Sequence, residues 1–165
     1  NKNMQKRGQF EISFSMIFSI IIIIAIVGVG FYVLTKFLGT TKCTEIGLFY
    51  DDLKDYINEA WISTIHEDTF TAKLPSDIES VCFGNITQNP EGQYRQEYNE
   101  LSKFFINAKD RNLFLYPIQK ACDSALAGIK LEHIKTNSFF CIRAENNKIE
   151  IKTSKGRFDS LVNLK

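Results

Sequence analysis

The chain has 165 residues, of which 44% are hydrophobic and 24% are charged. The net charge is +1, but from Cys43 onward 15 Lys and Arg stand against 18 Asp and Glu, a net of −3. A mildly acidic C-terminal region gives no electrostatic reason to expect a nucleic-acid partner. Its length suits one compact domain with its own core.

An apolar stretch from Ile12 to Leu34 dominates the N-terminal part and carries no charged residue. As a helix its 23 residues would reach about 34 Å, enough to cross a hydrocarbon layer of about 30 Å. Lys2, Lys6 and Arg7 precede it. Because basic residues favour the cytoplasmic flank of a membrane helix, we expect a cytoplasmic N-terminus and an external C-terminal domain.

Residues 6–11 (KRGQFE) form a short motif directly before this stretch. The motif resembles the class III signal sequence of type IV pilins, in particular the archaeal branch. The resemblance implies that a prepilin-type peptidase cuts between Gly8 and Gln9 and that an assembly platform then receives the chain. The acid of the segment, Glu11, is third after that bond, whereas bacterial pilins carry a glutamate at the fifth position, here Ser13.

The same resemblance implies how the chain is divided and what it assembles into. Residues 1–11 would be a basic segment whose first eight residues are removed, and residues 12–38 would be a transmembrane or filament-core helix. Copies of this helix would pack into a helical homopolymer at the cell surface that serves adhesion or surface contact. The assembly contacts would come from Glu11, Phe14, Phe18, Ile21, Ile24 and Phe31.

From residue 41 the pattern becomes amphipathic, with apolar residues such as Ile46, Phe49 and Leu53 at steps of three and four. This spacing predicts a helix over 41–63. Gly39 leaves two readings open, one helix of more than 50 residues or two helices with a flexible joint. The first reading is the architecture that the pilin resemblance implies, an α+β fold in which the helix packs on a small antiparallel sheet.

The rest of the extracytoplasmic domain, residues 41–165, is predicted to be mainly strands. The turn residues 145–147 favour a hairpin between the segments on either side. We expect an antiparallel meander whose core includes Trp61, Phe83, Phe114 and Phe140. Strands are predicted at 69–74, 78–83, 112–116, 138–144, 148–153 and 157–164, with a second helix at 94–110.

Four cysteines with long gaps and no CxxC pair indicate disulfides on the oxidising side of a membrane. Three pairings are possible, and we favour the sequential bridges Cys43 to Cys82 and Cys122 to Cys141. Four free thiols in a reducing compartment are the alternative. Asn85-Ile86-Thr87 is an N-glycosylation triplet, which makes Asn85 a candidate for modification.

Motifs of catalysis are missing from the sequence. The two histidines, His66 and His133, have no second strong ligand at a metal-binding spacing on the same element. We therefore expect no enzyme activity, no cofactor and no metal. Besides the filament subunit, two readings remain: a single-pass anchored binding domain or membrane-complex subunit that does not polymerise, and an anchored enzyme.

Overall fold

A computed structural model describes residues 14–88, 90 and 92–165. It divides the chain into two compact units with the boundary between Leu38 and Gly39. One helix, α1 (Phe14–Ile62), is assigned across this boundary and includes Gly39. No proline precedes Pro75, and nothing removes a backbone donor from α1.

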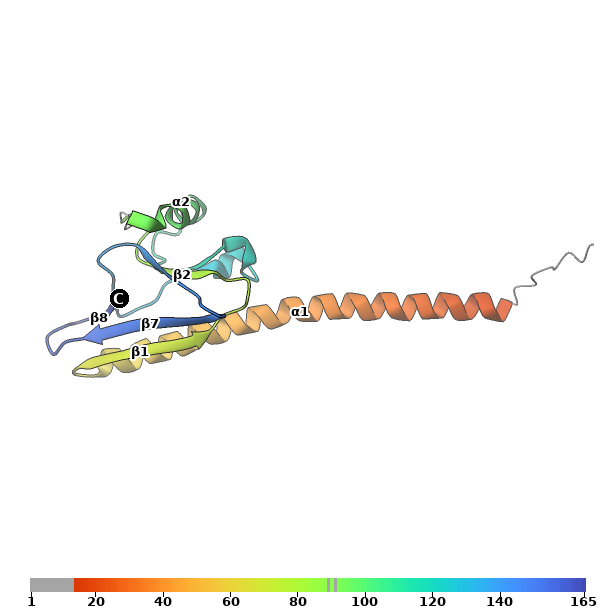
Figure 1. The fold of residues 1–165 in the computed structure, drawn as a ribbon, viewed down its shortest axis with the longest axis horizontal. Coiled ribbons are helices and arrows are strands. Elements are labelled where there is room, and N and C mark those ends of the chain that lie inside the picture. Colours follow the sequence, from red (N-terminus) through yellow and green to blue (C-terminus); the bar gives the residue numbers. More distant parts are fainter. Residues whose placement is uncertain (1–13, 89, 91) are drawn as a thin grey trace, which may run out of the picture. The chain divides into compact units, whose positions relative to one another are not determined.

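The C-terminal unit, which we call the head (residues 39–165), combines the second part of α1 with two sheets (Figure 1). An α+β fold with a long N-terminal apolar helix is thus confirmed. The strands are β1 (His66–Lys73), β2 (Ser80–Phe83), β3 (Leu113–Tyr116), β4 (Gly128–Ile129), β5 (Ile134–Lys135), β6 (Phe140–Arg143), β7 (Lys148–Lys155) and β8 (Val162–Leu164). The remaining helices are α2 (Arg95–Phe104) and the 3-10 turns η1 (Gly92–Tyr94), η2 (Ile118–Lys120) and η3 (Ser124–Ala127).

The strands form two four-stranded sheets rather than the predicted single meander. One sheet has the order β1-β7-β8-β5 and the other β4-β3-β2-β6. All pairs are antiparallel except β5 with β8, which run parallel. The central strands β2 and β3 are buried on both faces, which explains their almost continuous apolar sequence.

The predicted hairpin around residues 145–147 forms its turn but not its ladder. Glu145 and Lys148 exchange backbone hydrogen bonds of 2.8 and 3.0 Å, and Asn146 and Asn147 have φ values of 52° and 60°. These are the values that a two-residue hairpin turn requires. Beyond the turn the chain separates, because β6 pairs with β2 and β7 pairs with β1 (Figure 1).

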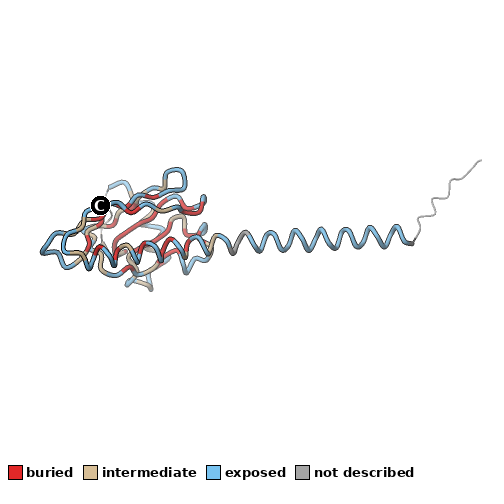
Figure 2. Tube along the Cα trace, turned by 90° about the horizontal axis from the view of Figure 1, so that it is seen from below, coloured by how far each residue is buried: buried red, intermediate tan, exposed pale blue. Residues whose placement is uncertain are grey.

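The second part of α1 supplies one wall of the core. Its buried side chains are Ile46, Phe49, Leu53, Ile57 and Ala60, which recur at the predicted steps of three and four. In Figure 2 this part of α1 alternates between buried and exposed positions. The amphipathic helix predicted from residue 41 is confirmed, and it ends at Ile62.

The predicted core members are only partly correct. Phe83 and Phe114 are fully buried, and Phe140 is half-buried. Trp61 is 39% exposed and lies one residue from the end of α1, next to the fully buried Ala60. Its indole stacks on His133 at 3.7 Å between ring centroids, and its Nε1 donates to the carbonyl of Ser160.

The second helix is shorter than predicted. α2 ends at Phe104, and the following residues turn through a bond from the Ala108 N–H to the Phe105 carbonyl. Phe105 still donates its N–H to the carbonyl of Leu101, and its ring is buried 5.2 Å from that of Phe114.

Candidate functional site

The most unusual surface of the molecule is the first part of α1. Every side chain described between Ser15 and Phe37 is exposed, including Phe31 at 71%. Figure 2 shows this stretch in pale blue along its described length. It is long and apolar enough to cross a membrane. We call residues 15–37 the apolar segment.

Two hydroxyls of the apolar segment are satisfied within the helix. The hydroxyl of Ser19 donates to the carbonyl of Ser15 at 2.9 Å, and that of Thr35 donates to the carbonyl of Tyr32 at 2.8 Å. Such bonds remove the cost of placing a hydroxyl in an apolar environment. Near the end of the segment the ammonium of Lys36 lies 5.8 Å from the ring centre of Tyr32. Aromatic and long basic residues are typical of a membrane interface.

The predicted assembly residues fall on one side of the helix where the structure describes them. Phe18, Ile21 and Ile24 follow one another at steps of three, and Phe31 lies seven residues further on. All four are exposed. Phe14 is the first residue of α1. Glu11 and the predicted cleavage site, Gly8 and Gln9, lie outside the described residues.

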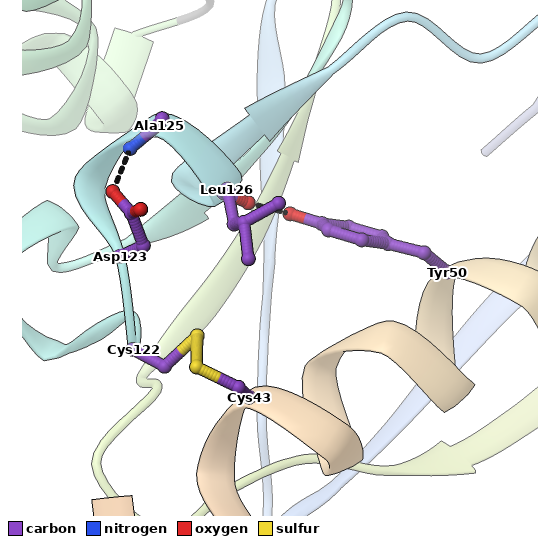
Figure 3. The surroundings of a disulfide bond; sticks show 6 residues. All are labelled: Cys43, Tyr50, Cys122, Asp123, Ala125 and Leu126. Carbon is purple, nitrogen blue, oxygen red and sulfur yellow. Dashed lines mark hydrogen bonds between the residues drawn. A yellow bond between two sulfur atoms is a disulfide. The ribbon is translucent and has the colours of Figure 1, made fainter. Parts of the chain in front are cut away.

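A disulfide fastens the start of the head helix, by which we mean residues 39–62 of α1, to the loop that follows β3 (Figure 3). Cys43 on α1 is bonded to Cys122, with Cα atoms 5.1 Å apart. About two turns further along α1, the Tyr50 hydroxyl donates to the carbonyl of Leu126 at 2.6 Å. Burial raises the pKa of Tyr50, so its hydroxyl stays a donor at neutral pH. The carboxylate of Asp123 holds the loop by accepting from the N–H of Ala125 at 2.8 Å.

The second disulfide joins directly opposed residues of two strands. Cys82 on β2 and Cys141 on β6 are partners in the ladder, with Cα atoms 3.9 Å apart. All four cysteines are thus paired, as expected, but the sequential pairing is wrong. The strand register explains the pairing. Because β2 lies beside β6, Cys82 faces Cys141, and Cys122 pairs with Cys43 on the helix.

Two lysines brace the ends of the head helix. At its start the ammonium of Lys42 pairs with the carboxylate of Asp77 at 2.5 Å, and this partner lowers the pKa of Asp77. At its end the ammonium of Lys155 donates to the carbonyls of Trp61 and Ser63. A cation there complements the negative end of the helix dipole. Sequence reasoning missed both contacts, because the partners are far apart in the chain.

The glycosylation triplet forms a compact turn. The side-chain oxygen of Asn85 accepts from the backbone N–H of Thr87 at 2.9 Å and from its hydroxyl at 3.0 Å. Asn85 is half-buried and Thr87 is exposed. Modification of Asn85 stays a prediction.

The two histidines contact hydroxyl groups or an aromatic ring. The Nε2 atom of His66 lies 3.1 Å from the hydroxyls of both Tyr56 and Thr153, and the His133 ring stacks on Trp61. The part of the chain that the structure describes holds no group of three His, Cys, Asp or Glu side chains able to bind a metal. The expectation that the chain is no enzyme stays untested.

The pilin resemblance has one source, the motif at residues 6–11 followed by an apolar stretch. The fold is compatible with it at the level of a long apolar helix and a small sheet-rich head. No family model, curated protein or solved structure matches this chain.

Proposed function

We propose that this chain is a structural subunit of a type IV pilus-like filament at the cell surface, assembled through its apolar segment. Before assembly the segment crosses the membrane, with the N-terminus cytoplasmic and the head outside. The filament serves adhesion or contact with surfaces. The head then forms the outer layer and the apolar segments form the dry interior.

One observation carries this proposal, the full exposure of the apolar segment within a single chain. Burying one Ile or Phe side chain contributes about 1.5–3 kcal/mol. Leaving a helix of such residues in water would cost tens of kcal/mol, against a usual folding stability of about 5–15 kcal/mol. Lipid or other copies of the helix must therefore cover it.

Lipid and a bundle of like helices are equally dry, so the segment passes from one to the other without meeting water. The internal bonds of Ser19 and Thr35 suit both environments. Side-by-side packing of copies related by a rotation and a rise makes a heterologous interface that does not close and grows into a fibre. A filament follows from repetition of one weak contact.

The head fits an external place in this account. Its two disulfides are suited to an oxidising compartment, and Lys2, Lys6 and Arg7 before the segment favour the cytoplasmic side. A prepilin-type peptidase acting after Gly8 and an assembly platform complete the proposed route.

Shearing of cells that produce the chain tests the proposal. We expect the chain in the sheared fibres, visible by electron microscopy and decorated by an antibody against the head. A chain found wholly in the membrane fraction, with no fibres, would overturn the filament and leave a single-pass anchored protein. The variant Ile23→Arg, which places a charge inside the apolar segment, is the matched negative control.

A further inference from the structure

Strand β1 is an edge strand of eight residues in the head. It pairs with β7 on one side, and no other strand of the described residues lies on its other side. Glu67, Thr69, Thr71 and Lys73 are all exposed, whereas Phe70 between them is buried. The outer face of β1 is thus polar and open along its full length.

The backbone N–H and C=O groups of these four exposed residues point away from β7. Thr69 is opposite Lys152 on β7, and the carbonyl of Lys152 accepts from Lys165 beyond β8. In an antiparallel pair, opposed residues direct their backbone groups either both inward or both outward. The N–H and C=O groups of Glu67, Thr69, Thr71 and Lys73 therefore line the free edge.

Charge along this edge is asymmetric. Glu67 and Asp68 lie near its beginning and Lys73 lies at its end. Within the described part of the chain neither Glu67 nor Lys73 takes part in a salt bridge. A second β1 laid antiparallel, with Phe70 opposite Phe70 of the second copy, brings Glu67 opposite Lys73 at both ends. In that register, the residues whose backbone groups line the free edge face one another. Glu67 faces Lys73, and Thr69 faces Thr71.

We propose that β1 is a self-recognition edge, through which the heads of two chains join their sheets antiparallel. The partner is a second copy of this chain. Parallel pairing is disfavoured because it places Glu67 and Asp68 beside the same residues of the copy. In the single chain the Thr69 N–H donates to the carboxylate of Asp68 at 2.7 Å. In the dimer this N–H donates instead to the carbonyl of Thr71 in the copy.

The direction of β1 decides where the second copy comes from. β1 runs back along the head helix, so that Lys42 at the start of the head helix meets Asp77 just beyond β1. In an antiparallel pair, the start of one head helix therefore lies at one end of the dimer and the start of the other lies at the opposite end. Neighbours within one filament share one direction, so the partner belongs to an opposing filament or membrane. The edge is a homophilic adhesion site.

This inference rests on the proposed external placement of the head, and full-length chain in phosphatidylcholine vesicles tests it. We expect wild-type vesicles of two colours to cluster. Glu67→Lys and Lys73→Glu should each lower clustering about tenfold, because each turns both symmetric ion pairs into like-charge pairs. Mixing Glu67→Lys vesicles with Lys73→Glu vesicles should restore it, since all four facing charges are then complementary.

Lys109→Glu and Asp110→Lys, exposed charge reversals after α2, are the matched controls and should cluster like wild type. Dispersed wild-type vesicles, or single variants that cluster normally, would overturn the inference. Because the assay needs neither cleavage after Gly8 nor fibres, its failure is distinguishable from failure of the filament proposal.

A cysteine trap tests the register directly. Residues 69 and 71 of opposed chains would form a hydrogen-bonded pair with Cα atoms about 5.5 Å apart, within reach of a disulfide. Mild oxidation of a mixture of Thr69→Cys and Thr71→Cys chains should give a cross-linked heterodimer. Cross-linking of either variant alone to the same extent would contradict the register.

Discussion

The two parts of α1 share a helical backbone but differ in what covers them. From Ser15 to Phe37 bulky apolar side chains are exposed on all sides, whereas from Ile46 to Ala60 most apolar side chains lie on one face that is buried in the head. The head part is braced by a disulfide at Cys43 and by the Tyr50 hydroxyl. The contrast teaches that a helix shows in its sequence whether its partner lies in the same chain or outside it.

Replacing one phenylalanine in each part of α1 by alanine should give the largest difference between the two parts. Phe49→Ala removes a fully packed ring and should lower the free energy of unfolding of the head by about 4 kcal/mol. Phe31→Ala, in the apolar segment, should leave that free energy unchanged. Denaturant titration in detergent, followed by Trp61 fluorescence, measures both. Equal losses would show that the apolar segment is packed on the head.

A charge placed in each part should separate them in the opposite sense. Ile23→Arg should make membrane insertion of the apolar segment about 3 kcal/mol less favourable. Asp55→Arg, on the exposed face of the head part, should leave insertion unaltered. Alkaline extraction of membranes measures the fraction that stays inserted. Complete retention of Ile23→Arg would argue against lipid around that residue.

Removing one brace of the head part should have a moderate effect. Tyr50→Phe deletes the hydrogen bond to Leu126 and should cost about 1 kcal/mol. Burial raises the pKa of Tyr50 above its ordinary value of 10.0, so the stability that its neutral form supports is complete below that pH and is lost as pH rises above it. As the pH rises above that value, the free energy of unfolding should therefore fall less in Tyr50→Phe than in the wild type. Identical alkaline profiles would contradict this role.

The Lys42 to Asp77 pair should give the smallest effect, since both side chains are partly in water. Lys42 lowers the pKa of Asp77 below its ordinary value of 3.8. The contribution is therefore present above that pH and fades as pH falls through the lowered pKa. Asp77→Asn should lower the melting temperature slightly at neutral pH, and this difference should shrink as the pH is lowered into the acid range. A constant difference across this range would assign the effect to another cause.

Periodicity made the helices and most strands predictable. Ile46, Phe49 and Leu53 could be placed on a buried face because each lies three or four residues from the next. The turn at Asn146 and Asn147 was readable from residue type, because asparagine tolerates positive φ. These signals depend on neighbours along the chain.

Contacts across the chain were not predictable from such signals. The pairing of Cys82 with Cys141 follows from the register of β2 and β6, which no local pattern encodes. Trp61 resembled a core residue by type, yet the helix ends beside it. The open edge of β1 required the strand order, because an edge strand and an inner strand with one exposed face have similar sequences.

The mass of the N-terminal peptide, from chains sheared off the cell surface, tests most directly whether the apolar segment is an assembly element. The account predicts that these chains begin at Gln9, with residues 1–8 removed before assembly. Surface chains that keep residues 1–8 would contradict it, since a charged leader would then be carried into the dry interior of the fibre.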